Sequence, residues 1–116
     1  MEKTWRKQFG VLFKIWRMEL GLTLREFCRK HELDPGYISR IERGLLSPPT
    51  RNPKTLVGFA KMLHLKKDSD DWQLFLDAGM ICAGQIPDDI MADRELVKRL
   101  FFIFHDMRRT KKKSRK

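Results

Sequence analysis

Histidine and cysteine are the side chains in this sequence best suited to bind a metal or to act as nucleophiles. The chain has three histidines and two cysteines, and they are His31, His64, His105, Cys28 and Cys82. The two cysteines do not form a metal or redox spacing such as CxxC, and the three histidines are not at a ligand spacing from one another. We therefore interpret both cysteines as packing residues and expect neither a metal site nor a cofactor.

Two pairs of neighbouring carboxylates, Asp70–Asp71 and Asp88–Asp89, are the remaining candidates for acid–base chemistry. Their positions fit the start of a helix and a linker better than a catalytic pair. The sequence also lacks a phosphate-cradling glycine loop and a nucleophile paired with a base. These observations predict that the protein is not an enzyme.

Charge is distributed unevenly along the chain. The 116 residues include 25 Lys and Arg against 15 Asp and Glu, which gives a formal net charge of +10. Residues 1–67 carry a net charge of +9, residues 68–107 of −6 and residues 108–116 of +7. Such asymmetry indicates a basic binding half, an acidic supporting half and a basic extension. An RNA or a membrane surface would also attract this charge, so composition alone leaves the partner open.

Hydropathy gives no sign of membrane insertion or export. No apolar run approaches the roughly 18 residues that a membrane-spanning helix needs. The first ten residues, MEKTWRKQFG, lack the apolar core of a signal peptide. Together with cysteines that form no disulfide pattern, these features predict a cytoplasmic protein without membrane attachment.

Apolar residues recur at helical spacing along almost the whole chain, and the alternation typical of strands is essentially absent. The spacing predicts an all-α fold. The expected helices are a first one that carries Trp5 to Leu20 and ends near Gly21, a second from about Leu24 to His31, a third from Pro35 to about Arg43, a fourth that opens at Pro53, a short fifth that begins near Asp70, and a last one from about Arg94 to Met107.

Short motifs predict where several of these helices begin and end. Thr23 and Glu26 form a capping box, in which each side chain bonds to the backbone N–H of the other. Asp34–Pro35 and Asn52–Pro53 each combine a favoured N-cap with a proline at the first helical position. Gly44 is typical of the residue that ends a helix.

The second and third helices carry the most specific pattern. Their sequence, LTLREFCRKHELDPGYISRIERG, places two short helices around a short turn, with Leu33, Ile38 and Ile41 at apolar core positions. Cys28 stands at a small-residue position, and the IERG segment ends the third helix. This segment resembles the Cro and phage-repressor type of helix-turn-helix, also called the xenobiotic-response-element (XRE) family of transcriptional regulators.

The resemblance covers about residues 9–65, or extends to Leu76 if the short helix near Asp70 is the fifth. It implies a five-helix, lambda-repressor-like DNA-binding domain, here followed by an additional C-terminal helix. In this family the third helix lies with its N-terminal half in the major groove of double-stranded DNA. Arg40 would then contact a guanine edge through two hydrogen bonds, and Tyr37 a thymine methyl group or a phosphate. A packing role is the alternative for Tyr37, and a solvated surface position for Arg40. The full set that matches the base-reading positions is Pro35, Gly36, Tyr37, Ser39 and Arg40.

The resemblance also implies a set of phosphate contacts at helix starts and in the loop after the third helix. Backbone N–H groups at the start of the fourth helix are expected to assist them. The matching residues are Thr23, Arg25, Arg43, Arg51, Asn52, Lys54 and Thr55.

Three features depart from the family pattern. Glu32 stands in the turn where the family usually has glycine, at an expected cost of roughly 1 kcal/mol for a left-handed backbone. Leu24 replaces a glutamine that usually supports the base-reading residue. The Leu45–Pro53 loop is longer and richer in proline than usual. The support of the reading residue and the position of the loop's phosphate contacts are therefore expected to differ.

The last helix carries a wide apolar stripe that either closes the core of the monomer or packs against another subunit. We favour a homodimer, because operators of this family are usually read by two-fold dimers. The stripe residues expected at the interface are Leu96, Leu100, Phe101, Phe104 and Met107. We accordingly divide the chain into a DNA-binding domain (residues 1–78), a linker and dimerisation or partner segment (79–107), and a basic tail expected to be disordered (108–116).

The sequence thus predicts a sequence-specific regulator of double-stranded DNA, a repressor that binds a palindromic operator as a homodimer. Two alternatives remain open. The first is an antitoxin with the same DNA-binding head, whose phenylalanine-rich C-terminal segment masks a toxin or another protein partner. The second is a protein-interaction adaptor that uses the fold without reading DNA.

Overall fold

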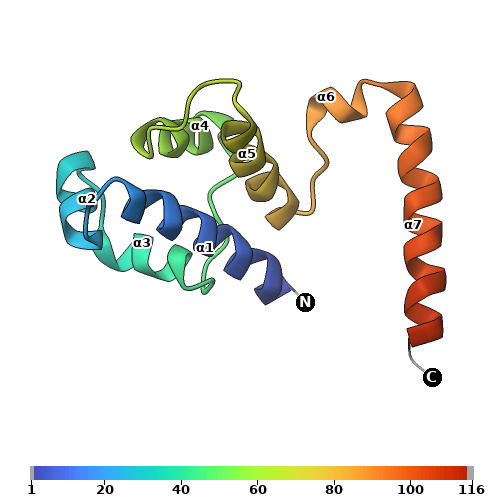
Figure 1. The fold of residues 1–116 in the computed structure, drawn as a ribbon, viewed down its shortest axis with the longest axis horizontal. Helices are drawn as coiled ribbons and strands as arrows, with labels where there is room; N and C mark the ends of the chain where they lie inside the picture. The colour runs from blue at the N-terminus through green and yellow to red at the C-terminus, as the bar shows by residue number, and fades with distance from the viewer. Residues whose placement is uncertain (1, 115–116) are drawn as a thin grey trace. The chain divides into compact units, whose positions relative to one another are not determined.

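The computed structural model describes residues 2–114, and within that range every regular element is a helix. The predicted all-α class is confirmed. In chain order the helices are α1 (Glu2–Glu19), α2 (Leu24–His31), α3 (Pro35–Glu42), α4 (Pro53–Met62), α5 (Asp70–Cys82), α6 (Asp88–Met91) and α7 (Arg94–Ser114) (Figure 1).

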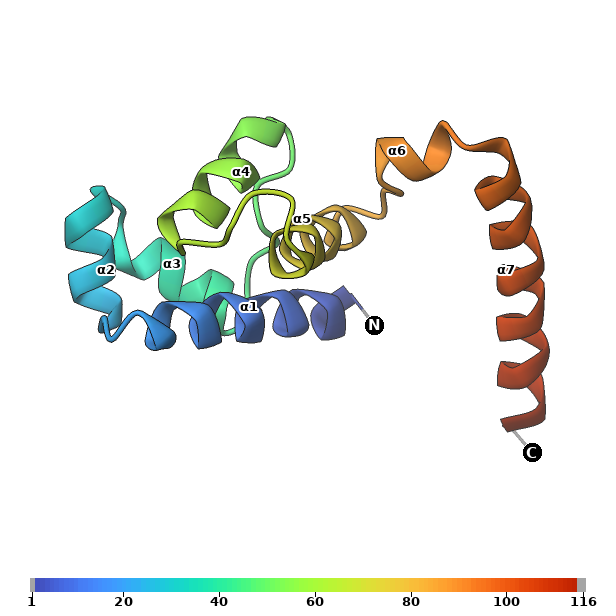
Figure 2. The ribbon, with the colours of Figure 1, turned by 45° about the horizontal axis from the view of Figure 1, so that its top comes forward.

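The chain divides into two compact units, Met1–Gln85 and Ile86–Lys116. The first unit holds α1 to α5, and the second holds α6 and α7. In the first unit α1 lies alongside both α3 and α5, while α2 and α3 meet at an angle across a short turn (Figure 2). This arrangement makes α1 the support against which α3 is held.

The predicted helix starts are confirmed by the capping contacts. Thr23 Oγ1 accepts a hydrogen bond from Glu26 N at 3.1 Å, and Glu26 Oε1 accepts one from Thr23 N at 2.9 Å. Asp34 Oδ2 caps α3 by accepting from Tyr37 N at 3.2 Å. Because each cap satisfies a backbone donor that the helix leaves free, these short helices begin at defined residues.

An aromatic cluster joins the helices of the first unit. The Phe13 ring packs edge-on against Phe27 of α2 and Phe59 of α4, with ring centroids 5.6 and 5.5 Å apart. Phe75 of α5 packs against Phe9 at 4.9 Å. Edge-to-face pairs of this kind are worth about 0.5–1.5 kcal/mol each beyond the area that they bury. The cluster therefore fixes α1, α2, α4 and α5 together.

Two glycines allow α1 to approach the end of α3 unusually closely. A Cβ atom on Gly10 would overlap the carbonyl oxygens of Ile41 and Glu42. A Cβ atom on Gly44 would lie 2.7 Å from the Cα of Lys7, and Gly44 also has a φ of +76°. Neither position has room for a side chain, so the α1–α3 crossing depends on both glycines.

The structure corrects three sequence-based expectations in the arrangement of elements. Trp5 begins the apolar spacing that predicts the first helix, but it is 48% exposed, because it lies beside α5 where the core ends. The predicted boundary after residue 78 falls inside α5, which continues to Cys82 because Gly79 is buried against the Leu56 side chain. The first unit accordingly extends to Gln85.

The third correction concerns the basic tail. Residues 108–114 were expected to be disordered, but they continue α7 as far as Ser114. No glycine or proline interrupts this stretch, and Arg and Lys are good helix formers. The Thr110 hydroxyl also donates to the Asp106 carbonyl at 3.0 Å. Residues 115–116 lie outside the described residues.

The second unit consists of the short α6 and the long α7. Asp93 Oδ1 caps α7 by accepting from the backbone N–H groups of Glu95 and Leu96 at 3.0 and 3.2 Å. Both helices begin within residues 79–107, the segment predicted to hold a linker and the last helix. In the described part of the chain, no helix has the length and apolar character needed to cross a membrane.

Candidate nucleic-acid interface

The two faces of α3 have different environments. Ile38 and Ile41 are fully buried in the core, as predicted. Gly36, Arg40 and Arg43 are exposed, and their i, i+4, i+7 spacing places them on one face. The same helix is therefore anchored by its apolar side chains and presents a basic outer face.

Arg40 has a defined position on that outer face. Its Nε donates a hydrogen bond to the Gly36 carbonyl at 3.2 Å, one turn back along α3. This bond uses one of the five N–H donors of the guanidinium group and leaves the four on the two terminal nitrogens. Arg40 is therefore held by a hydrogen bond within its own helix, and this contact does not require a glutamine at position 24.

A side chain at Gly36 would fit on the first turn of α3 without a clash. A Cβ atom there would meet Arg40 Nη2 and Asp34 Oδ2 at 3.7 Å, which is ordinary van der Waals contact. The fold itself therefore does not require glycine at this position. Because glycine has no side chain, a ligand can approach the backbone beside the Arg40 guanidinium more closely than at any other residue type.

The other predicted base-reading residues differ in exposure. Pro35 is exposed at the start of α3, whereas Tyr37 and Ser39 are half-buried. Tyr37 packs against the core cluster, and burial raises the pKa of its phenol. Its ring therefore contributes to packing, and only part of the ring surface is available to a ligand. Its hydroxyl group keeps its proton at neutral pH.

The predicted phosphate-contact residues lie at three places in the first unit. Thr23 and Arg25 are exposed at the start of α2, and Arg43 is exposed at the end of α3. The remaining four residues form a continuous stretch at the start of α4, where only Thr55 is half-buried: Arg51, Asn52, Lys54 and Thr55.

Two of the backbone N–H groups at the start of α4 already have partners within the chain. Lys54 N donates to Asn52 Oδ1 at 3.0 Å, and Thr55 N donates to the Asn52 carbonyl at 2.9 Å. Pro53 has no N–H to offer. At positions 53 to 55 the groups that remain for a phosphate are therefore side chains, chiefly that of Lys54.

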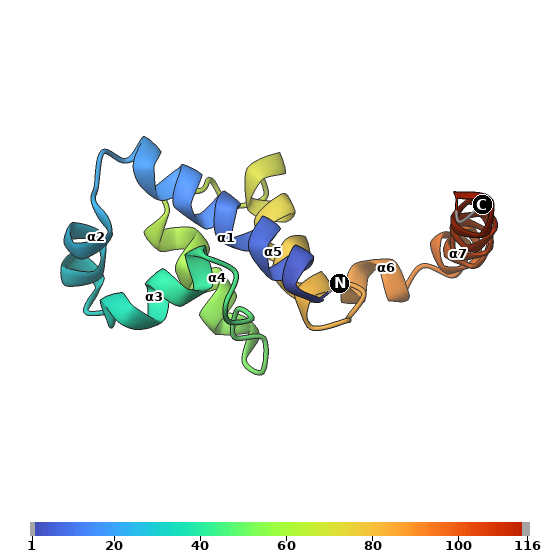
Figure 3. The same ribbon diagram turned by 90° about the horizontal axis from the view of Figure 1, so that it is seen from below.

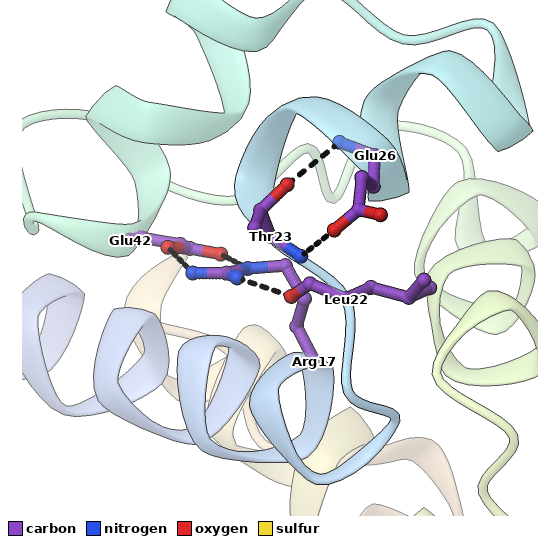
Figure 4. A network of polar contacts seen from close by, with 5 residues as sticks. All are labelled: Arg17, Leu22, Thr23, Glu26 and Glu42. Atoms are coloured by element: carbon purple, nitrogen blue, oxygen red, sulfur yellow. Dashed lines mark hydrogen bonds and ion pairs between the residues drawn. The ribbon is translucent and has the colours of Figure 1, made fainter.

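A buried ion pair that we did not predict holds the end of α3 against α1. Arg17 Nε and Nη2 donate to Glu42 Oε2 and Oε1 at 2.7 and 2.9 Å, and Arg17 Nη1 donates to the Leu22 carbonyl at 2.8 Å (Figure 4). The hydrogen bond to Glu42 raises the pKa of Arg17. A paired contact of this geometry is strong and directional. The guanidinium thereby joins α1, α3 and the turn before α2.

The sequence does contain a signal for this pair. Arg17 follows Phe9 and Phe13 at successive intervals of four residues, so it stands on the apolar face of α1. A charge at such a position requires a buried partner. The partner, Glu42, lies 25 residues away, and nothing in the local pattern shows that these two residues pair with each other.

The departures from the family pattern have clear structural counterparts. Glu32 has φ 55° and ψ 46°, the left-handed conformation that explains why glycine is usual there. Leu24 is half-buried and packs against the core cluster. Position 24, where the family usually has a glutamine, thus carries a packing side chain in this protein.

Comparison with known families supports this geometry. A family model described as a helix-turn-helix domain matches residues 8–69, which is more than half of the chain. Comparisons with curated proteins and with solved structures find no match. The matched range contains α1 from residue 8 onward and the whole of α2 to α4, with α2 and α3 as the two helices of the motif. The chain belongs to the helix-turn-helix domain family.

Proposed function

We propose that this protein is a sequence-specific regulator that binds double-stranded DNA through α3 in the major groove. The observation that carries the proposal is the outer face of α3, where Arg40 stands braced over a bare Gly36 while the opposite face is locked into the core. An arginine held in this way loses little freedom when it contacts the edge of a guanine.

Arg40 is the base-reading residue in this proposal, and Pro35, Gly36, Tyr37 and Ser39 surround the contact. Thr23, Arg25 and Arg43 bind phosphates on either side of the groove. The stretch Arg51–Thr55 adds further phosphate contacts through its side chains. Phosphate contacts position a protein on the duplex, whereas contacts to base edges give it specificity.

We further propose that the protein acts as a homodimer on a palindromic operator and represses transcription. Support for the homodimer comes from α7, whose Phe101, Phe104 and Met107 remain 64%, 38% and 62% exposed. Leu96 and Leu100, which are half-buried, extend the same stripe. A dimer seated on an operator excludes other proteins from that stretch of DNA, which is the simplest route to repression.

Selection of bound sequences from a pool of random duplex DNA tests this function. The expected result is one palindromic site whose half-sites are centred about 10 base pairs, or roughly 34 Å, apart or a multiple of that distance. Enrichment of a single, non-palindromic half-site would contradict the dimer while leaving base reading intact. Uniform recovery of all sequences would contradict base reading and favour an adaptor that uses the fold for protein contacts.

A further inference from the structure

The second unit separates its charges by position along the chain. Its beginning carries four acidic residues and one basic residue between positions 86 and 95. The end of α7, residues 108–114, carries five basic residues and no acidic ones. Glu95 and Arg109 stand fourteen residues apart on α7, or roughly 20 Å at 1.5 Å per residue. This distance exceeds the Debye length of about 10 Å at 0.1 M salt, so the two ends act as separate charges.

The exposed apolar side chains of α7 lie between these two charged ends. Phe101, Ile103 and Met107 are 64%, 49% and 62% exposed, and Phe104 is 38% exposed. Such side chains, close together on a single helix, favour burial against another surface. Figure 1 shows α7 from the side as an unbroken helix, and Figure 3 shows it nearly end-on.

We infer that α7 pairs with α7 of a second copy in the antiparallel orientation. This inference rests on the proposed homodimer and names its geometry. In an antiparallel pair the two apolar stripes meet in the middle, and the acidic end of each copy faces the basic end of the other. In a parallel pair the same stripes meet, but acidic ends face acidic ends and basic ends face basic ends. Like charges placed in this way oppose association.

The charge separation also suits the dipole of α7 itself, because acidic residues stabilise a helix start and basic residues a helix end. That effect acts within one chain and predicts no change in dimer affinity beyond the loss of helix. The two explanations are therefore separable by measuring self-association and helicity in the same variants.

The test uses the full chain and sedimentation equilibrium to measure the dimer dissociation constant. One variant reverses the acidic end (Asp89→Lys with Glu95→Lys), a second reverses the basic end (Arg108→Glu with Arg109→Glu), and a third combines all four changes. The third has the wild-type net charge of +10. A control with Glu19→Lys and Asp71→Lys changes two exposed residues of the first unit and has the same net charge as the first variant.

For the antiparallel pair we expect each single-end reversal to raise the dissociation constant by about tenfold or more, since several exposed charge pairs are lost at once. The combined variant should recover most of the wild-type affinity, and the control should change it much less. The basic-end variant is the sharpest of these tests, because it lowers the net charge from +10 to +6. Lower net charge alone would strengthen association, whereas the antiparallel pair predicts weakening.

Three results would overturn the inference. A basic-end variant that dimerises more tightly than wild type indicates the parallel pair, and the homodimer itself then stands. If neither reversal changes the dissociation constant but both reduce helicity, the charges act only by stabilising α7 through its dipole. A wild-type chain that stays monomeric at about 100 μM, far above the concentration at which an operator-binding dimer works, contradicts the homodimer of the proposed function as well. Circular dichroism measures the helicity of each variant. If a charge reversal unfolds α7, the milder variant Arg108→Gln with Arg109→Gln replaces it. This variant should weaken the dimer by a smaller factor.

Discussion

The two units of this chain bury their large apolar side chains to very different degrees. In the first unit Phe9, Phe13 and Phe27 are fully buried around α1. In the second unit Phe101 and Phe102 are 64% and 72% exposed. The support that holds α3 in place is therefore complete within a single chain. The apolar surface of α7, by contrast, is available for a partner, and we assign that partner as a second copy.

The largest expected effect comes from replacing one phenylalanine with alanine in each unit and comparing the two losses of unfolding free energy. Phe59→Ala removes a ring that is 3% exposed and should lower the free energy of unfolding by about 3–5 kcal/mol. Phe102→Ala removes a ring that is 72% exposed and should change it by less than about 0.5 kcal/mol. Urea denaturation of both variants, at a concentration where the chain is monomeric, measures the difference. Equal losses would mean that the second unit has a core of its own.

The next comparison removes a glutamate from each unit. Glu42→Ala leaves Arg17 charged and buried without its partner, which should cost about 3–5 kcal/mol of unfolding free energy. Glu95→Ala, at an exposed position on α7, should cost less than about 0.5 kcal/mol. A double variant, Arg17→Met with Glu42→Leu, removes both charges and should recover much of the stability. If Glu42→Ala were as stable as wild type, the pair would not hold α3.

Much of the first unit follows from local sequence. The capping box at Thr23 and Glu26 and the N-caps at Asp34 and Asn52 predicted helix starts that the structure confirms. These motifs are readable because each involves residues at most three positions apart. The buried positions of Ile38 and Ile41 likewise follow from helical spacing.

The features that sequence reasoning missed join residues far apart in the chain or depend on backbone contacts. The Arg17–Glu42 pair spans 25 residues. Gly10 resembles an ordinary weak point within a helix, and only the α1–α3 crossing shows that no side chain fits there. The occupied N–H groups of Lys54 and Thr55 depend on how the Asn52 cap turns the chain. None of these contacts has a mark in the local sequence pattern that identifies the partner.

A smaller effect concerns strain in the turn between α2 and α3. Glu32→Gly removes the Cβ atom that disfavours the left-handed conformation and should raise the free energy of unfolding by about 0.5–1 kcal/mol, after the greater flexibility of glycine in the unfolded chain is counted. Glu32→Ala is the matched control, because it removes the charge but keeps the Cβ atom. Thermal denaturation of the two variants should show stabilisation by glycine only. Equal stabilisation by alanine would attribute the effect to charge.

The smallest expected effect is a pH dependence within the first unit. Burial, together with Lys30 and His64, lowers the pKa of His31 below its ordinary value of 6.5. The unfolded chain then binds this proton more readily than the folded chain. The histidine therefore lowers stability as the pH falls below about 6.5 and has no effect above it. Denaturation at about pH 7.5 and about pH 5.5 measures how much unfolding free energy is lost between the two pH values. This loss should be smaller for His31→Gln than for wild type, and identical losses would contradict this role.

The central claim is that the outer face of α3 reads DNA bases while the stretch at the start of α4 holds phosphates. The most direct measurement compares Arg40→Ala and Lys54→Ala, both exposed positions, on the selected operator and on random DNA at one salt concentration. Arg40→Ala should weaken operator binding by about 1–3 kcal/mol and leave random DNA almost unaffected, whereas Lys54→Ala should weaken both alike. If Arg40→Ala changes neither affinity, or lowers both equally, α3 does not read bases through Arg40 and the account fails.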